Sequence, residues 1–398
     1  MEIGGYVMYD EIFEKVRLII DRVRNEGDMA LFELTEMFDG VRIESIKVSR
    51  EEVDRAYESV DDRLIDSLET AKENIERFHY ITMPERDIRI DFGDCIMGKK
   101  LVPVDAAGLY IPGGRASYPS TVLMSAIPAN LAGVKTVVAC TPPDKEGGIN
   151  HLTLVAMDLC EIDEIYRVGG AHAIAAMAYG TESVKKVDKI AGPGNIYVTA
   201  AKLLVQRDVA IDLPAGPSEV LVIADESAEA DVIFLECISQ LEHDPMARAI
   251  LVTTSAELGR EVEEKIRSVI SDPNFKFTVV ASMAEAVEAS NRIAPEHLVI
   301  IAENHWQVFE KIRHAGSVFL GKFSPVSAGD YASGTNHILP TGGYARMFSG
   351  LSVETFLKSV TYQELSKEAL ERLGQAVINL ARAEGLEWHA KSVEERLK

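Results

Sequence analysis

The apolar positions of the N-terminal region recur with a helical period. Residues 9–83 are rich in charge, and Leu64, Leu68 and Ala71 recur at spacings that place them on one face of a helix. This pattern predicts helices through the region. Short strands are predicted directly after it, over residues 86–103.

From Ala106 onward, short apolar runs alternate with helix-like stretches. Buried strands are predicted at 136–140, 219–224, 250–253, 278–281 and 298–301. Helices are predicted around them, at 120–131, 228–243, 255–270, 283–293 and 304–314. Strands and helices in alternation are typical of parallel sheets that are covered by helices.

The alternating blocks indicate an α/β fold with two Rossmann-like layered units, a helical N-terminal region and a small helical C-terminal tail. The units are incomplete, because no GxGxxG fingerprint follows a predicted strand. We expect a larger α/β domain from residues 1–105 with 219–345, a second α/β domain over 106–218, and a helical tail over 346–398. Within the tail, Gly385 separates a long helix from a short terminal one.

The charge of the chain argues against two classes of partner. The chain has 398 residues and a net charge of −22, spread along its length. Nucleic acid and anionic membrane surfaces attract basic proteins, so neither is an expected partner. No apolar stretch approaches the length of a membrane span. Residues 1–6 show no basic region followed by an apolar run, so we expect no signal peptide.

The cysteines show no spacing typical of a disulfide or metal site. None is arranged as CxxC or CxxxC, and all lie in or beside apolar segments, at Cys95, Cys140, Cys160 and Cys237. Buried thiols are the simpler interpretation. We therefore expect a cytoplasmic, reduced, globular protein.

One polar segment, residues 329–340, is the richest in candidate chemistry. Its sequence, GDYASGTNHILP, has no regular period but contains six side chains that can ligate or hydrogen-bond. Asp330 and His337 offer an oxygen ligand and a nitrogen ligand. The segment is therefore either a solvated turn or part of a site, and a site needs partners from elsewhere in the chain.

Two further pairs could supply such partners. Gln240 and His243 are spaced i, i+3 near the end of the helix predicted at 228–243, which places both side chains on one face. Glu296 and His297 are adjacent just before a predicted strand, and a carboxylate beside an imidazole can divide acid and base roles. Taken alone, each pair is more typical of capping or surface groups.

Glycine-rich segments mark three more places of interest, at 108–115, 192–195 and 215–219. Taken singly, each is best interpreted as an ordinary tight turn. Near the C-terminus, Glu384 and His389 lie on either side of the break in the tail. A histidine in an acidic tail is usually a surface residue.

Together these segments resemble the histidinol dehydrogenase family. The matching motifs occur in one order over most of the chain: GLYIPGG at 108–114, GPGN at 192–195, DLPAGPSE at 212–219, SQLEH at 239–243, PEH at 295–297 and GDYASGTNH at 329–337. The resemblance implies an NAD-dependent, zinc-requiring enzyme that oxidises L-histidinol to L-histidine through L-histidinal, in histidine biosynthesis. It also implies a homodimer.

The resemblance further implies roles for single residues. The zinc ligands, for one ion per subunit, are Gln240, His243, Asp330 and His389, the last supplied by the neighbouring subunit of an intertwined dimer. The catalytic pair is Glu296 and His297. The substrate contacts are Ser218, His337 and Glu384, together with His297 and the four zinc ligands. The NAD contacts are Tyr110, Asn195 and His172. The family usually has Gln at the last position, and the histidine ring offers one hydrogen bond without the carboxamide's geometry.

The implied chemistry is two successive oxidations. His297 removes the alcohol proton while hydride passes to NAD, and Glu296 then polarises the water that adds to the aldehyde. Histidinol brings two nitrogen donors, so a zinc ion with four protein ligands becomes six-coordinate. The role of the zinc is then to position the substrate.

Three other interpretations stay open on the sequence. A relative could oxidise a different amino or polar alcohol, although His337 and Glu384 favour histidinol. A zinc hydrolase could use the same ligands, with Glu296 activating water. The two layered units and the filled set of protein ligands argue against it. A non-enzymatic metal-binding or scaffold protein would leave the pair of Glu296 and His297 without a purpose.

Overall fold

The computed structural model describes residues 4–113, 117–214, 216–243, 245–271 and 273–398. The chain divides into two compact units. The first contains the chain up to Thr82 together with Val104–Phe356, and the second contains Met83–Pro103 and Leu357–Lys398. Each unit is described by itself.

The first unit contains two five-stranded sheets, and the strands of the first sheet have the order β5-β4-β3-β6-β7, all parallel. Numbered along the chain this order is 3-2-1-4-5, which is typical of dinucleotide-binding α/β folds. The strands are β3 (Ala106–Tyr110), β4 (Thr136–Cys140), β5 (Glu164–Tyr166), β6 (Lys189–Ala191) and β7 (Ala210–Ile211). The helices between them are α5 (Pro119–Ala132), α6 (His151–Leu159), α7 (Gly170–Tyr179) and α8 (Ile196–Val205).

Four N-terminal helices cover this first sheet and its helices. They are α1 (Gly4–Glu26), α2 (Asp28–Asp39), α3 (Arg50–Ser59) and α4 (Asp62–Ile81). One face of α1, with Val16 and Ile20, is buried in the same apolar cluster as Ala173 of α7 and Val198 of α8. The helical period read from the sequence therefore marks the buried face of these helices.

The second sheet of the first unit repeats the same topology, with the order β10-β9-β8-β11-β12 and all strands parallel. Its strands are β8 (Glu219–Ala224), β9 (Arg248–Thr253), β10 (Phe275–Val279), β11 (His297–Ile301) and β12 (Ser317–Leu320). Its helices are α9 (Ala230–Leu241), α10 (Ala256–Val269), α11 (Met283–Ile293), α12 (His305–Phe309) and α13 (Val326–Tyr331). Two short 3-10 turns follow, at Tyr344–Arg346 and Val353–Phe356.

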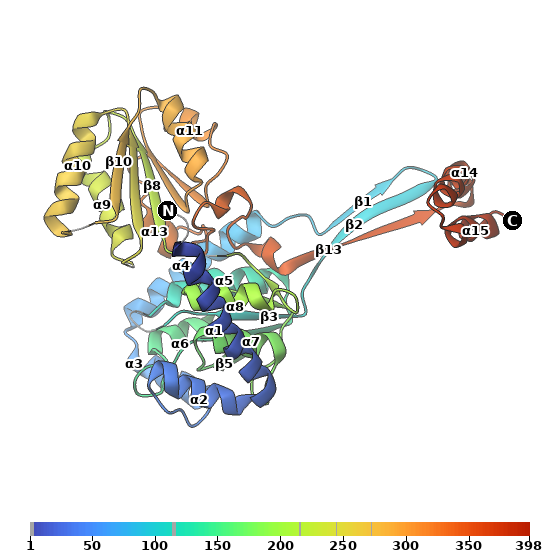
Figure 1. Cartoon of the computed structure of the whole chain (residues 1–398), viewed down its shortest axis with the longest axis horizontal. Coiled ribbons are helices and arrows are strands. Elements are labelled where there is room, and N and C mark those ends of the chain that lie inside the picture. Colours follow the sequence, from blue (N-terminus) through green and yellow to red (C-terminus); the bar gives the residue numbers. More distant parts are fainter. Residues whose placement is uncertain (1–3, 114–116, 215, 244, 272) are drawn as a thin grey trace. The chain divides into compact units, whose positions relative to one another are not determined.

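Both faces of this sheet are buried, which explains the uninterrupted apolar runs in its strands. Along β8, Val220 and Val222 pack against α9 and α10 on one face, while Leu221 and Ile223 pack against α11 on the other. Figure 1 shows α9 and α10 on the side of the sheet opposite α11.

The second unit is a three-stranded antiparallel sheet followed by two helices. The strands, β1 (Asp87–Asp91), β2 (Cys95–Pro103) and β13 (Leu357–Leu365), have the order β1-β2-β13. The helices α14 (Lys367–Ala383) and α15 (Glu387–Arg396) pack against each other around a small cluster of Ile378, Ala381, Ala390 and Val393.

The predicted fold class, α/β with two Rossmann-like sheets, a helical N-terminal region and a helical C-terminal tail, is confirmed. Three local predictions were wrong. The region after 346 contains the strand β13, the helix expected at 304–314 is only the five residues of α12, and α9 ends at Leu241. The proposed domain boundaries stay a prediction. Among the described helices, none is long and apolar enough to cross a membrane.

Candidate active site

The candidate catalytic residues lie at the amino ends of the second sheet's strands. Glu219, Arg248 and His297 are the first residues of β8, β9 and β11, and the sheet register pairs Glu219 with Arg248 and His297 with Val220. Parallel sheets usually carry their sites at the carboxyl ends of the strands. Here α9 connects the end of β8 to the start of β9, so the C-terminal end of α9, with Gln240, leads to the amino ends of the strands.

Glu296 and His297 are both buried, with 5% and 4% of their surface exposed. The backbone N–H of Glu219 donates to Glu296 Oε2 at 2.8 Å, and the N–H of Glu296 donates back to Glu219 Oε1 at 3.3 Å. His297 Nδ1 lies 3.7 Å from Glu296 Oε2, and Nε2 lies 3.4 Å from Asp330 Oδ1. Both ring nitrogens are buried, and neither contact has the geometry of a full hydrogen bond among the described residues.

Burial and charge shift the pKa values of this pair upward. Burial raises the pKa of Glu296, and the neighbouring charge of His297 offsets only part of that shift. Burial lowers the pKa of His297, but the carboxylates of Glu296 and Asp330 outweigh it and raise the pKa. The histidine is therefore a strong base as long as the carboxylate of Asp330 is uncompensated.

The acidic partner, Asp330, lies on α13 and not in an irregular loop. Burial raises the pKa of its carboxyl, but favourable interactions with His297, His337 and His243 outweigh burial, so the pKa of Asp330 is lowered overall. The structure therefore places an acceptor oxygen among three imidazoles. His337 Nδ1 lies 2.7 Å from the Asp330 carbonyl oxygen, and Nε2 lies 3.3 Å from Thr121 Oγ1.

Gln240 is buried at the last turn of α9, with 2% of its surface exposed. His243 lies two residues beyond the helix and is exposed, with its backbone N–H donating to the Gln240 carbonyl oxygen at 3.3 Å. The helix thus ends before His243, and the expected shared face of Gln240 and His243 stays a prediction.

Three charged residues of this region were not found from the sequence. Glu219 Oε1 accepts hydrogen bonds from the N–H groups of Glu296 and Gly342, while Oε2 forms an ion pair with Arg248. Glu236, one turn before Gln240 on α9, accepts a hydrogen bond from the N–H at the start of α13 at 3.1 Å. This contact ties together the two helices that carry Gln240 and Asp330.

Ser218, the other expected substrate contact of the first unit, lies directly before β8 and is half-buried. The segment that leads to it is anchored by a hydrogen bond from the Gly216 N–H to Thr341 Oγ1 at 2.5 Å. Ala215, within the same motif, lies outside the described residues.

The expected NAD contacts lie at the carboxyl ends of the first sheet's strands. Tyr110 ends β3, and Gly192 follows its neighbour β6, so the two flank the point where the strand order reverses. This position is the usual dinucleotide crevice of such sheets. The Tyr110 hydroxyl accepts a hydrogen bond from the Gly170 N–H, at the start of α7, at 3.0 Å.

Asn195 is exposed and caps α8, where its Oδ1 accepts hydrogen bonds from the N–H groups of Tyr197 at 3.0 Å and Val198 at 3.1 Å. Its carboxamide nitrogen can still donate to a ligand. Gly114 and Arg115, at the end of the 108–115 motif, lie outside the described residues.

His172 is buried in α7, with 1% of its surface exposed. Its Nε2 lies 3.4 Å from Thr35 Oγ1, and its ring lies 6.0 Å from that of Phe38, both on α2. Burial lowers the pKa of His172 to about 3, so the ring is neutral. It can offer one donor and one acceptor, and Thr35 lies beside one of its nitrogens.

Glu384 and His389 lie in the second unit. Glu384 follows the last residue of α14, His389 is on α15, and both are exposed. Among the residues that the structure describes, no three His, Cys, Asp or Glu side chains form a group that could hold a metal ion. The expected set within the first unit contains only two residues of these types, His243 and Asp330, beside the carboxamide of Gln240.

The chemistry of these residues fits both a divalent metal and a dinucleotide. Carboxylate, carboxamide and imidazole donors suit zinc and its neighbours among the transition metals. At the first sheet, Gly192 has a φ of +121°, and a side chain there would overlap the carbonyl oxygen of Tyr110. Close backbone packing of this kind at a strand end is typical of dinucleotide sites.

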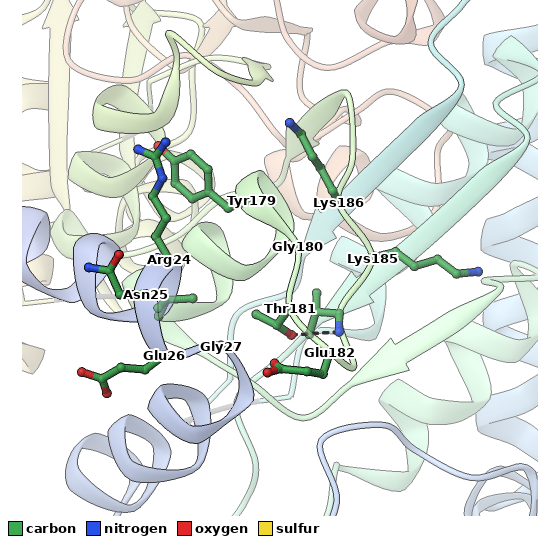
Figure 2. A pocket seen from close by; sticks show the side chains of 12 residues that line it. Arg24, Asn25, Glu26, Gly27, Tyr179, Gly180, Thr181, Glu182, Lys185 and Lys186 are labelled. Carbon is green, nitrogen blue, oxygen red and sulfur yellow. Dashed lines mark hydrogen bonds between the residues drawn. The ribbon is translucent and has the colours of Figure 1, made fainter.

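A surface pocket lies apart from both groups of residues. Figure 2 shows its walls, which come from the end of α1 and the turn after α7. Arg24 lies over the ring of Tyr179 at 4.9 Å, and Thr181 accepts a hydrogen bond from the Val184 N–H at 3.0 Å. Because the pocket is at the C-terminal end of α7 and Tyr110 contacts its N-terminal end, it is separate from the expected NAD contacts.

Comparisons with known proteins agree over nearly the whole chain. The sequence model of the histidinol dehydrogenase family matches residues 6–397. The chain is 59% identical to histidinol dehydrogenase of Archaeoglobus fulgidus, covering 98% of this chain and 97% of that protein. It is 49% identical to the enzyme of Methanocaldococcus jannaschii, covering 98% and 94%.

A solved structure shows the same fold. The crystal structure of histidinol dehydrogenase from Elizabethkingia anophelis matches with a TM-score of 0.93 and 42% sequence identity, over 96% of this chain and 92% of that one. Family model, relatives and structure agree, and the chain belongs to the histidinol dehydrogenase family.

Proposed function

We propose that this protein oxidises L-histidinol to L-histidine through L-histidinal, with two NAD as hydride acceptors, as part of histidine biosynthesis. The observation that carries the proposal is the buried pair of Glu296 and His297 beside Asp330. Both ring nitrogens of His297 are buried without a full hydrogen bond among the described residues, and their charged neighbours are the carboxylates of Glu296 and Asp330. Buried, unpaired polar atoms are costly unless a ligand satisfies them.

The metal set in this proposal is Gln240, His243 and Asp330, completed by His389. The first three come from the α9 turn and α13, which Glu236 ties together. His389 rests on the family resemblance, in which it comes from the second subunit of a homodimer. A bound zinc ion would fix the imidazole and amine nitrogens of the substrate. Its charge would also offset the Asp330 carboxylate and bring the pKa of His297 down towards neutrality.

The protein groups then have distinct tasks. In the first oxidation His297 takes the proton of the alcohol, while NAD, when bound, accepts the hydride. In the second, water adds to the aldehyde, and the pair of Glu296 and His297 takes up the protons released as the second hydride leaves. The raised pKa of Glu296 suits a carboxyl that exchanges protons near neutral pH.

The remaining contacts complete the proposed site. Ser218, His337 and Glu384 hold the substrate, and Tyr110, Asn195 and His172 contact NAD. Two of these roles are supported by position in the fold, since Ser218 precedes β8 and Tyr110 lies with Gly192 at the reversal point of the first sheet. The other roles rest on the family resemblance. We place the enzyme in the cytoplasm, and its four free, buried cysteines fit a reducing compartment.

One assay tests the proposed function. The purified protein is incubated with L-histidinol, excess NAD and zinc, and the NADH formed is counted for each substrate molecule consumed. We expect two NADH for each histidinol. One NADH would indicate a simple alcohol dehydrogenase. No NADH with histidinol, but turnover of another amino alcohol, would indicate a relative with a different substrate.

A further inference from the structure

A buried ion pair lies behind the expected NAD contacts and has no part in the chemistry proposed above. Lys202 is on α8 with 3% of its surface exposed, and it forms an ion pair with Asp212, whose side chain is 1% exposed. Lys202 Nζ also donates hydrogen bonds to the carbonyl oxygens of Gly192 at 3.0 Å and Leu213 at 3.1 Å.

The ion pair fixes both backbone groups of Gly192. Lys202 holds its carbonyl oxygen, and Asp212 Oδ2 accepts a hydrogen bond from its N–H at 2.8 Å. Gly192 has a φ of +121°, a conformation that residues other than glycine rarely adopt. An unrestrained glycine would populate many conformations, so the two side chains select one of them.

Gly192 lies beside residues that are expected to contact NAD. Gly192 packs against the backbone of Tyr110 at the end of β3, and the turn that it begins ends at Asn195, the cap of α8. Of the three expected NAD contacts, Tyr110 therefore packs against Gly192, and Asn195 ends the turn that Gly192 begins. Lys202 itself lies two turns along the helix that Asn195 caps, so the same short element carries the clamp and the contact.

Stability alone is a poor explanation for this ion pair. Removing two charges from water is unfavourable, and replacing a buried ion pair by apolar residues of similar size is often neutral or stabilising. The hydrogen bonds to Gly192 and Leu213, in contrast, define a loop conformation that apolar side chains could not define.

We propose that Lys202 and Asp212 are positioning residues that hold the 192–195 turn ready for the dinucleotide before it binds. The inference rests on the proposed function, because it takes NAD to be the ligand of this turn. Holding the turn in its bound form lowers the conformational cost of binding. The effect should appear in NAD affinity and leave the chemical step unchanged.

The test compares the wild-type protein with the double variant Lys202→Met/Asp212→Leu, by calorimetric titration with NAD. We expect the double variant to fold with a lower melting temperature, because backbone groups of Gly192 and Leu213 lose their partners. It should bind NAD at least about tenfold more weakly, which corresponds to about 1.4 kcal/mol. In steady-state assays the KM for NAD should rise, while kcat at saturating NAD stays within about threefold. The KM for histidinol should also change little, because Gly216 and Thr341 anchor the segment before Ser218 independently.

The control is Lys185→Met, which removes the ion pair between Lys185, in the loop before β6, and Glu164, the first residue of β5, away from the turn. It should bind NAD as the wild type does. Unchanged NAD affinity in a folded double variant would overturn the inference and leave the proposed function intact. Failure of the wild-type protein to bind NAD would overturn both.

A second measurement needs no variant. In hydrogen exchange of the wild-type protein without NAD, the amide of Gly192 should be protected to the same degree as the amides of β6, because Asp212 already holds it. Rapid exchange at Gly192 that slows only when NAD is added would show that the turn is not set in advance. That result would overturn the inference even if the double variant fails to fold.

Discussion

Glu219 and Glu296 hold each other through reciprocal hydrogen bonds, each backbone N–H donating to the carboxylate of the other. Two buried carboxylates this close would repel, but Arg248 forms an ion pair with Glu219. Glu219 thus carries a compensated charge and serves as a fixed support, while Glu296 is left with a raised pKa. The two glutamates are chemically alike and have different tasks, because Arg248 forms an ion pair with Glu219, while the charge of His297 offsets only part of the effect of burial on Glu296.

The first prediction concerns this support. Glu219→Ala removes the acceptor of two backbone N–H groups and the partner of Arg248, at about 1–3 kcal/mol for each buried group left unsatisfied. We expect a lower melting temperature and a kcat reduced more than tenfold, about 1.4 kcal/mol in the barrier. Glu219→Gln keeps an acceptor oxygen and should retain more of both. Equal activity in the two variants would show that the carboxylate does not position Glu296.

The second prediction concerns the base. His297→Asn should reduce the rates of both oxidations by about 10²–10⁴-fold, the usual contribution of a general base. Zinc content, measured by elemental analysis, should stay at the wild-type level, because His297 is not among the proposed ligands. A variant that loses its zinc would show that His297 acts through the metal and would contradict the assignment.

The third prediction separates the two steps. Glu296→Gln should harm the oxidation of histidinal more than its reduction to histidinol, because only the oxidation requires a polarised water molecule. Both directions can be followed from histidinal, with NAD in one assay and NADH in the other. Equal losses in the two directions would indicate that Glu296 only orients its neighbours.

The fourth prediction concerns the second unit. His389→Ala should lower the zinc content of the purified protein, because the proposed set then loses one of its two imidazole ligands. His151→Ala serves as the control, since His151 is exposed at the start of α6 and no proposed contact involves it. Elemental analysis that finds equal zinc in both variants would remove His389 from the ligand set.

The fifth prediction concerns stability and pH. Burial lowers the pKa of His79 from 6.5 to about 4, so the folded protein keeps this ring neutral while the unfolded chain takes up a proton. The contribution of neutral His79 to the free energy of unfolding is therefore complete above about pH 6.5. It is lost as the pH falls towards 4, at about 1.4 kcal/mol per pH unit.

In urea unfolding at about pH 7 and about pH 5, His79→Gln should lose less stability than the wild type between the two conditions. The comparison isolates His79, because both proteins share every other titrating group. A wild-type loss no larger than that of the variant would mean that the buried ring is already protonated in the folded state.

Much of the fold could be predicted from the sequence, because the buried strands are visible as short runs of apolar residues. In β8 every residue from Glu219 to Ala224 is buried. A strand that is covered on both faces has a continuous apolar run, and this run indicated the strand in the sequence. The strand β13 was missed because most of its side chains are exposed, so no apolar run or clean alternation marks it.

The site could be predicted only in part. Asp330 and His297 are far apart in the sequence and lie 3.4 Å apart in the fold, and no spacing rule relates them. The family motifs supplied that connection. Glu219 ends the 212–219 motif but has no role implied by it, and Arg248 and Glu236 lie outside the motifs. Charged residues in an acidic chain are usually surface residues. Burial distinguishes Glu219 and Glu236, and burial is visible only in three dimensions.

The second unit is joined to the first by three peptide links, after Thr82, after Pro103 and after Phe356. The last two links are neighbours, because Val104 donates a hydrogen bond to the Phe356 carbonyl oxygen at 3.0 Å. Within the unit, β2 and β13 pair along nine residues each, so the two chain segments carry their own scaffold. Removing the chain after Phe356 would therefore take away β13 together with the tail that carries Glu384 and His389, and it would leave β2 paired with β1 alone.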